Sequence, residues 1–280
     1  AWDFTLNDDF RLQTTFSYLG GESCYSALDW HSAPNPMPDY YRYMPGYAAN
    51  PEVAAAVREA WESRDPDVTQ VNWDELYYVN RHGTATPASY AVGGAVTANR
   101  CFQFVSSFEY RMSGLNRLRG GVQIRNDRTS RYQRLEDLLG GDYLLNVDSY
   151  LIDDEYYGDK IQNDLQHPNR RVGVGERYGY DYDLDYSSYG AWVLADLHSA
   201  REAGLYGYVG GRAAQVSFYR DGRYEKELFP GGRSLGRSDR LSFTEYLLKG
   251  GIGYMFTPSH SIEVRVAYGD VAPVADAVFL

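Results

Sequence analysis

Four pairs of segments in the chain alternate between apolar and polar residues with a period of two, less cleanly in the third pair than in the others. The pairs cover residues 2–6 and 10–18, 102–111 and 117–125, about 188–197 and 205–218, and 246–256 and 262–266. Such alternation places apolar side chains on one face of a β-strand and polar side chains on the other. Because only a short turn separates the members of each pair, the pattern predicts four antiparallel hairpins, or about eight strands.

Long connections of about 20–100, 127–186 and 220–240 separate the hairpins, so short and long links alternate along the chain. Structureless links of this length count against a compact soluble domain. Outer-membrane barrels, in contrast, have short periplasmic turns and long extracellular loops. The pattern therefore favours an all-β fold, an antiparallel transmembrane β-barrel segment with short periplasmic turns and long extracellular loops that contain short helices.

The two faces of the strands suit lipid on one side and water on the other. One face is rich in Phe, Leu, Val and Ile. The opposite face carries charged residues that we expect to face a wet lumen, namely Glu109, Arg117, Arg119, Arg125, Glu263 and Arg265. The simpler interpretation is a soluble antiparallel sheet whose apolar face packs a protein core. The two interpretations differ in what the apolar face touches.

Several aromatic residues lie beside the short turns. Phe, Trp and Tyr together make up 15% of the chain, which contains 27 Tyr. Tyr and Trp are enriched where a membrane meets water, and barrels carry aromatic girdles at that level. We therefore expect a membrane aromatic belt made of Trp2, Phe4, Phe108, Tyr110, Tyr254 and Phe256.

The first long connection contains signals for short helices. Asn50 is a suitable N-cap, with Pro51 at the first helical position and an Ala-rich run after it. Asn72 is a second N-cap candidate, with Glu75 three residues later and Gly83 after the expected end. These signals predict an ordered loop.

The same connection is crowded with aromatic side chains that could contact a ligand. Aromatic platforms stack on sugars and pack against peptides. The candidate ligand contacts are Tyr40, Tyr41, Tyr43, Trp73, Tyr77 and Tyr78. The competing interpretation is that these rings pack against one another and order the loop.

Charge and hydropathy exclude two classes of protein. The chain has 38 Asp and Glu against 27 Lys and Arg, a net charge of −11, which argues against a nucleic-acid partner. Its mean hydropathy is −0.51. No apolar run approaches the roughly 18 residues that a membrane-spanning helix needs.

Few residues suggest chemistry at a site. Asp181, Asp183 and Asp185 share one face of an extended segment and are weak candidates for a calcium site. Because the glycine and terminal glutamate of a calcium loop are missing, a solvated acidic ladder is the favoured interpretation. The five histidines lack metal-ligand spacing. We therefore expect no cofactor, no other metal site and no enzymatic activity.

Two other features allow more than one interpretation. Cys24 and Cys101 both lie near the expected extracellular rim of adjacent strands, where an oxidising environment permits a disulfide. The sequence does not give their separation, so the bridge remains one of two alternatives. Arg170 and Arg171, and the arginines of residues 233–240, are suited to phosphate or lipopolysaccharide, or are simply exposed loop residues.

Several loop segments resemble a known family. They are residues 26–30 (SALDW), 38–45 (PDYYRYMP), 71–80 (VNWDELYYVN), 137–143 (DLLGGDY) and 162–169 (QNDLQHPN). These segments resemble the barrel region of TonB-dependent outer-membrane receptors, in the branch that carries a carboxypeptidase-like regulatory domain. The resemblance implies that residues 1–280 form one partial β-barrel domain from the central or C-terminal part of a 22-stranded barrel. We expect no plug, TonB box or signal peptide in this chain.

The resemblance also implies a function. A receptor of this kind lies in the outer membrane of a Gram-negative cell and imports a nutrient, here an unidentified ligand. Its expected partners are outer-membrane lipid, the TonB complex acting through the plug, and a surface lipoprotein. Two alternatives are a self-contained surface barrel or adhesin without transport, and a soluble secreted glycan-binding β protein.

Overall fold

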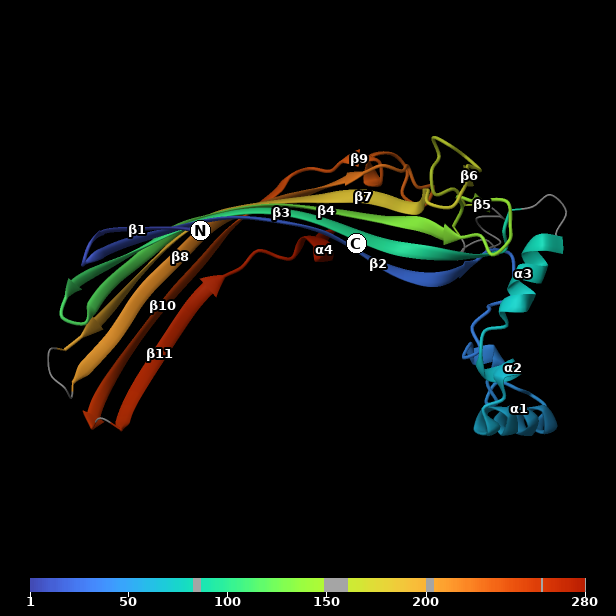
Figure 1. Cartoon of the computed structure of the whole chain (residues 1–280), viewed down its shortest axis with the longest axis horizontal. Helices are drawn as coiled ribbons and strands as arrows, with labels where there is room; N and C mark the ends of the chain where they lie inside the picture. Colours follow the sequence, from blue (N-terminus) through green and yellow to red (C-terminus); the bar gives the residue numbers. More distant parts are fainter. Residues whose placement is uncertain (83–86, 149–160, 200–203, 258, 280) are drawn as a thin grey trace.

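Most of the chain forms one long antiparallel sheet that curls into half a barrel (Figure 1). The computed structural model describes residues 1–82, 87–148, 161–199, 204–257 and 259–279. The main strands follow one another in chain order across the sheet. They are β1 (Trp2–Asn7), β2 (Phe10–Trp30), β3 (Tyr90–Ser113), β4 (Asn116–Asp137), β7 (Arg177–His198), β8 (Leu205–Gly222), β10 (Leu241–Thr257) and β11 (His260–Asp270).

Smaller strands lie beside this sheet. β9 (Gly236–Arg237) pairs with β8, and β5 (Leu144–Leu145) pairs with β6 (Arg171–Val172) in a separate two-stranded sheet. Within the described residues, β1 and β11 each pair with a neighbour on one side only. The sheet therefore has two edges.

The short turns gather at one end of the sheet and the long connections at the other (Figure 1). The turn between β1 and β2 is closed by Asn7, whose side-chain oxygen accepts the N–H groups of Asp9 at 3.0 Å and Phe10 at 2.8 Å. Gly114, with φ of +57°, occupies the left-handed conformation between β3 and β4. The turn expected at residues 200–204 lies largely outside the described residues.

The strands extend well beyond the segments that alternate. The connections expected at about 20–100 and 127–186 are in fact 31–89 and 138–176. In residues 20–23 and 126–130 both faces carry small or polar side chains, so the alternation disappears. The backbone ladder continues there because it pairs N–H and C=O groups whatever the side chains are.

Three helices fill the first long connection and hang from the end of the sheet (Figure 1). They are α1 (Pro51–Ser63), α2 (Pro66–Thr69) and α3 (Trp73–His82). Both predicted caps form: Asn50 accepts from the N–H of Glu52 at 2.8 Å, and Asn72 accepts from that of Glu75 at 3.2 Å. Gly83, the expected C-terminal signal, lies outside the described residues. No helix in the described ranges has both the length and the apolar character needed to cross a membrane.

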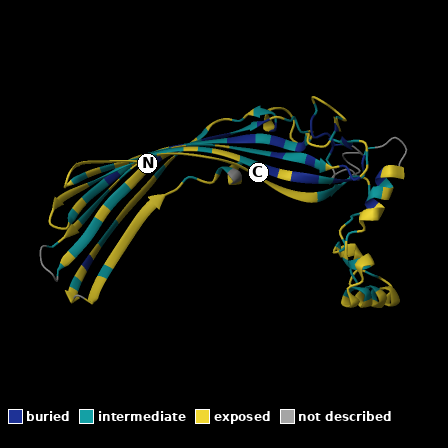
Figure 2. Ribbon diagram, viewed as in Figure 1, coloured by how far each residue is buried: buried dark blue, intermediate teal, exposed yellow. Residues whose placement is uncertain are grey.

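Buried residues concentrate at the long-connection end, whereas the short-turn end and β11 are mostly exposed (Figure 2). Two apolar clusters hold the long connections onto the strands. One contains Leu135, Leu144, Val172 and Tyr178, and the other centres on Leu76, Tyr90 and Leu139.

Asn80 fastens α3 to this end of the sheet. Its buried amide donates to the carbonyls of Tyr90 at 2.8 Å and Leu138 at 2.9 Å. Its oxygen accepts the N–H groups of Ser89 and Tyr90. Because both ends of this amide are satisfied, Asn80 joins the helix, the start of β3 and the end of β4.

The segment after β11 returns under the arch of the sheet (Figure 1). It ends in α4 (Ala275–Val278), and the ring of Phe279 packs edge-on against Phe218 of β8 at 5.9 Å. The N–H of Ala272 donates to Glu245 at 3.2 Å. Phe218 and Glu245 therefore lie on the concave face of the sheet.

Candidate functional site

The register joins the apolar faces of all the hairpins into one surface. Residues that are directly opposite each other in paired strands point to the same side. One such row runs from Phe108 through Gly120, Val193, Gly211 and Leu248 to Tyr268. These positions have the opposite parity to Phe218 and Glu245, so this face is convex.

We call the apolar part of the convex face the apolar band. Much of it is exposed: Phe16 is 65%, Val122 46% and Val264 62% exposed. On β3 it runs from Phe102 to Tyr110, eight steps or about 26 Å at roughly 3.3 Å per residue. The band comprises Leu12, Phe16, Tyr18, Phe102, Phe104, Phe108, Tyr110, Leu118, Val122, Ile124, Tyr189, Val193, Leu197, Leu205, Val209, Tyr246, Leu248, Ile252, Tyr254, Ile262, Val264, Val266 and Tyr268.

The border of the apolar band that faces the long connections is slanted relative to the rows of paired residues. On β3 the apolar band ends at Phe102, and the next residues on this face toward the long connections are Arg100, Ala98 and the buried Val96. On β11 the band ends at Tyr268, with Asp270 beyond it. Tyr268 and Phe108 lie in the same row of paired residues. On β3, this row is six residues away from Phe102, where the band ends on that strand. The border therefore moves by six residues across five strand intervals.

The concave face carries the charged residues expected to face a lumen. The register places Glu109 opposite Arg119, Arg111 opposite Arg117, and Gln103 opposite Arg125. Glu263 and Arg265 of β11 lie opposite Gly253 and Gly251 on the same face. All six predicted residues, Glu109, Arg117, Arg119, Arg125, Glu263 and Arg265, therefore share the face opposite the apolar band.

These charges are paired along and across strands. Arg119 donates to Asp196 at 2.5 Å, and Arg265 lies 2.7 Å from Glu263. Arg117 and Glu109 are 3.7 Å apart. Asp196 was not among the predicted residues, although its place in the alternation of β7 could have identified it.

Two glycines on the concave face make room for tyrosine rings. A Cβ atom on Gly253 would lie 2.4 Å from the ring of Tyr206, and one on Gly251 would lie 2.6 Å from that of Tyr208. Each ring thus covers the backbone of the neighbouring strand. This packing makes part of the concave surface aromatic, and the hydroxyl of Tyr206 donates to Glu263 at 3.5 Å.

The predicted aromatic belt lies at the short-turn end. Trp2 and Phe4 stack at 5.9 Å, and Tyr110, Tyr254 and Phe256 are exposed. Phe108 lies further from the short turns, where its ring covers Gly120.

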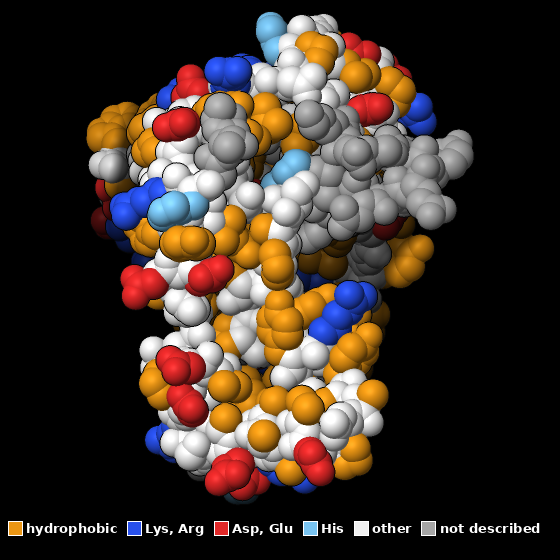
Figure 3. Space-filling model, turned by 90° about the vertical axis from the view of Figure 1, so that its right-hand side faces the viewer, with side chains coloured by type: hydrophobic (Ala, Val, Ile, Leu, Met, Phe, Trp, Pro, Cys, Tyr) orange, Lys and Arg blue, Asp and Glu red, His pale blue; other side chains and the backbone are white. Residues whose placement is uncertain are grey.

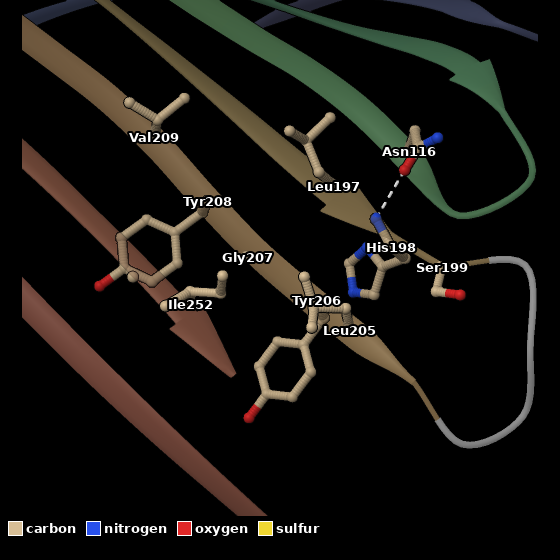
Figure 4. A pocket seen from close by; sticks show the side chains of 11 residues that line it. Asn116, Leu197, His198, Ser199, Leu205, Tyr206, Gly207, Tyr208, Val209 and Ile252 are labelled. Atoms are coloured by element: carbon tan, nitrogen blue, oxygen red, sulfur yellow. Dashed lines mark hydrogen bonds between the residues drawn. The ribbon is translucent and has the colours of Figure 1, made fainter. Parts of the chain in front are cut away.

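A shallow groove of about 450 Å³ opens beside the turn after β7 (Figure 4). In it the side-chain oxygen of Asn116 accepts the N–H of His198 at 2.6 Å.

A larger cleft of about 680 Å³ lies in the first long connection. It is enclosed by the proline-rich segment 34–38 and by α1, α2 and α3. Its lining is mostly apolar, with Met37, Met44 and Val57 among its residues, and charged side chains such as Arg42 and Glu75 also line it. Hydrophobic side chains gather on the lobe that carries α1 and α2 (Figure 3). The cleft suits a ligand with an apolar part and a few polar groups.

The six predicted ligand-contact aromatics do not form one site. Tyr40 packs edge-on against Tyr41 at 4.8 Å and Tyr43 at 5.3 Å, and Tyr43 lines the cleft. Tyr77 lies under Arg81, Tyr78 stacks on His82, and Trp73 is exposed at the start of α3. The rings of Tyr40, Tyr41 and Tyr43 therefore pack together at one wall of the cleft. The other three rings lie on α3 and do not line the cleft.

Asp181, Asp183 and Asp185 lie on the convex face beyond the apolar band, where arginines surround two of them. Asp183 is 2.7 Å from Arg128 and 2.6 Å from Arg223. Within the described ranges no cluster of His, Cys, Asp and Glu is arranged to hold a metal. The weak metal candidate is therefore an ion-paired network.

The two central carboxylates of this network have shifted pKa values in opposite directions. Burial would raise the pKa of Asp183, but hydrogen bonds from Ser130 and Arg128 and the charge of Arg223 hold it below its ordinary value. Burial raises the pKa of Asp181, and Arg177 only partly opposes this effect. Asp183 is thus the carboxylate that the arginines stabilise most.

Cys24 and Cys101 are both free thiols, so the bridge considered from the sequence is not formed. Cys24 lies opposite Val96, whereas Cys101 lies opposite Leu19, five residues away on the same strand. An odd separation also places the two side chains on opposite faces of the sheet.

The comparisons with known proteins found no protein-family model that matches the chain and no curated protein that matches its sequence. The fold and the two faces of the sheet define the class, a β-rich chain with a half-barrel-like sheet.

Proposed function

We propose that this chain forms part of the wall of an outer-membrane β-barrel, and that the complete barrel is a TonB-dependent receptor that imports a nutrient. The observation that carries the proposal is the apolar band, which is convex, about as tall as the lipid-facing band of such barrels, and slanted. The convex position is the most specific of the three features, because the apolar side chains of a soluble barrel face its interior.

Tilted strands in a membrane produce a slant of predictable size. Neighbouring strands are about 4.8 Å apart and tilt by about 35–45°, so a level membrane border moves by roughly 1.0–1.5 residues per strand. Five intervals give about 5–7 residues. The border moves by six from Phe102 to the row of Tyr268. The slant shows that the band is level across tilted strands, as in any barrel, and its position on the convex face separates it from the packed interior of a soluble barrel.

The two faces support the same proposal. In a soluble barrel the apolar side chains would fill the interior. Here the convex face is apolar, with Val266 69% exposed. The concave face carries the ion pairs Arg119–Asp196 and Arg265–Glu263. Lipid outside and a wet passage inside would satisfy both faces.

The edges of the sheet indicate that further strands complete the barrel. Within the described residues β1 and β11 have unpaired outer edges. An unpaired backbone N–H or C=O group in hydrocarbon costs several kcal/mol, so an open edge is not stable there. In the proposed receptor, other barrel strands pair with β1 and β11.

The cleft in the first long connection is the proposed place of first contact with the ligand. It lies at the long-connection end, which is the extracellular end in the proposed orientation. The charged concave face would then select which solute passes. In this proposal, Tyr43 and its neighbours bind the ligand first. Residues such as Arg119 and Glu263 then select which solute passes through the barrel.

Cysteine scanning tests which face meets lipid. In a Cys24→Ser, Cys101→Ser background, Val122→Cys and Gln123→Cys place a thiol on the convex and concave faces of the same strand. We expect a lipid-soluble maleimide to label Val122→Cys in vesicles and a water-soluble one to label Gln123→Cys. Equal labelling of both by the water-soluble reagent contradicts the membrane assignment.

Two further observations separate the alternatives. A soluble glycan-binding protein would stay monodisperse without detergent, whereas the proposed barrel requires it and changes its gel mobility on heating. An adhesin would share that behaviour, but the precursor would lack the plug and TonB box that a receptor carries before its barrel.

A further inference from the structure

A row of arginines borders the apolar band on the convex face. Arg100 of β3 lies directly opposite Arg128 of β4. The same row continues through Asp185 of β7 and Tyr219 of β8. Arg240 lies beside Tyr219, with its guanidinium 4.6 Å from the centre of the ring. The row is one step beyond Phe102, the residue at which the apolar band ends on β3.

A groove of about 230 Å³ connects these arginines with the apolar band. Arg100, Arg128 and Arg240 line it together with Tyr18 and Phe102, which belong to the band. One groove therefore offers three arginines and the carboxylate of Asp185 on its long-connection side, and exposed aromatic rings on the side of the apolar band. A ligand that fits it has an anionic end and an apolar end.

Two of the arginines keep their charge available. Arg100 is exposed and has no ion pair within the described ranges. Arg240 donates to the Ser217 hydroxyl at 3.1 Å, a neutral group, and lies over a neutral ring. Arg128 is shared with Asp183 at 2.7 Å and with Asp185 at 3.9 Å. Arg240 is therefore oriented, and within the described ranges neither Arg100 nor Arg240 is neutralised by a carboxylate.

Basic residues on the convex face occur only at this border and beyond it. In the described strands, the register places Arg100, Arg128, Arg134, Arg237 and Arg240 on the long-connection side of the apolar band. The arginines beside the short turns, Arg11, Arg111, Arg117 and Arg265, all face the concave side. The convex face is thus aromatic at one border, and it carries all of these arginines, together with acidic residues such as Asp185 and Asp270, at and beyond the other.

We propose that this groove binds a phosphate-bearing membrane lipid, with its phosphate groups at Arg100 and at Arg240, the two ends of the row, and the acyl chains along the apolar band. The inference rests on the proposed function, because it requires the convex face to lie in a bilayer. Since the long connections mark the extracellular end, the lipid belongs to the outer leaflet.

The chemistry of the groove explains why phosphate is the expected anion. Guanidinium groups bind phosphate through paired N–H donors, and this geometry is more specific than that of a lysine ammonium. Arginines at headgroup level also avoid the cost of entering hydrocarbon. The exposed rings of Tyr18 and Phe102 lie where the acyl chains begin, which ties headgroup and chain recognition to one place.

The test uses the full chain in micelles of a neutral maltoside detergent. Binding of lipid A with both phosphates is compared with binding of the same lipid after its phosphates are removed, and with inorganic phosphate alone. The double variant Arg100→Gln, Arg240→Gln removes the two available charges, and Arg100→Lys, Arg240→Lys keeps them. Arg58→Gln, Arg64→Gln is the matched control, since both arginines are exposed on or beside α1.

We expect the glutamine pair to raise the Kd for lipid A about thirtyfold, the factor for losing two arginines near an anionic headgroup. The α1 control should bind within a few-fold of the parent chain. The lysine pair should bind more tightly than the glutamine pair and more weakly than the parent chain, because it keeps the charges and loses the paired donors. High salt should weaken binding, because the contact is electrostatic. Inorganic phosphate alone should bind far more weakly than the lipid.

Several outcomes would overturn the inference. They are equal binding of lipid A with and without phosphate, an unchanged Kd in the glutamine pair, or an equal loss in the α1 control. If inorganic phosphate binds as tightly as the lipid, the site recognises a free anion and the lipid assignment is wrong. Detergent dependence and maleimide labelling test the membrane assignment separately, so a chain that passes those tests but fails this one refutes only the lipid site.

Discussion

Placing an arginine on the apolar band tests the membrane assignment by its effect on stability. Val122 lies on the convex face near the middle of the band on β4, between Leu118 and Ile124. Gln123 is the next residue of the same strand and faces the concave side. The pair Val122→Arg and Gln123→Arg therefore introduces the same side chain, one residue apart, on the two faces.

The expected magnitudes differ between the two positions. An arginine on the lipid face near the bilayer midplane costs about 2–4 kcal/mol. Val122 is 46% exposed in the chain, so the loss of its transfer into lipid adds up to about 1 kcal/mol. On the concave face Gln123→Arg exchanges one polar group for another in water, and such a change is usually within about 0.5 kcal/mol.

The assay unfolds the full chain in phospholipid vesicles with guanidinium chloride at equilibrium. The folded fraction is measured by gel mobility with and without heating. We expect the unfolding midpoint of Val122→Arg to fall far below that of Gln123→Arg, with similar slopes for both. Stabilities within about 0.5 kcal/mol of each other would mean that the convex face is not in lipid. That result would refute the reasoning from the two faces of the sheet.

Three further predictions concern the long-connection end. Asn80→Ala should loosen α3 by about 2–4 kcal/mol, because it leaves several buried backbone groups unpaired; faster hydrogen exchange at α3 checks this, and unchanged exchange contradicts it. Asp183 has a lowered pKa in the folded chain, so its contribution to stability is present above its unfolded pKa of about 3.9 and disappears as the pH falls through the folded value. Asp183→Asn should therefore flatten the acid branch of stability against pH, and an unchanged slope would show that the arginines do not stabilise this carboxylate. Because Cys24 and Cys101 are free, an alkylating reagent should modify both thiols of the unfolded chain without prior reduction, and mass spectrometry should show two added groups. A chain whose mass does not change would instead contain a disulfide.

Much of the local structure was predictable from the sequence. The hairpin from Phe10 back to Trp2, the two N-caps at Asn50 and Asn72, and the parity of Arg119 and Glu263 all follow from interactions between residues close in the chain. Alternation, capping and turn chemistry are local, so each can be recognised without knowing its neighbours in space. The expected fold is confirmed at this level, as an antiparallel half-barrel sheet with few helices.

The candidate sites were less predictable, because they depend on contacts between residues far apart in the chain. Asp183 resembles a metal ligand until β4 and the segment after β8 bring Arg128 and Arg223 to it. Cys24 and Cys101 look like a pair until the register separates them by five residues and a change of face.

The sequence by itself determined that the chain has two-faced strands, short turns at one end and capped helices in its first long connection, since each depends on a few neighbouring residues. The tertiary structure decided how far the strands extend, how the separate apolar faces join into one slanted band, and where Arg100 meets Arg240. The physical reason is that register is set by the summed pairing of whole strands, whose backbone groups bond equally well beneath apolar and polar side chains.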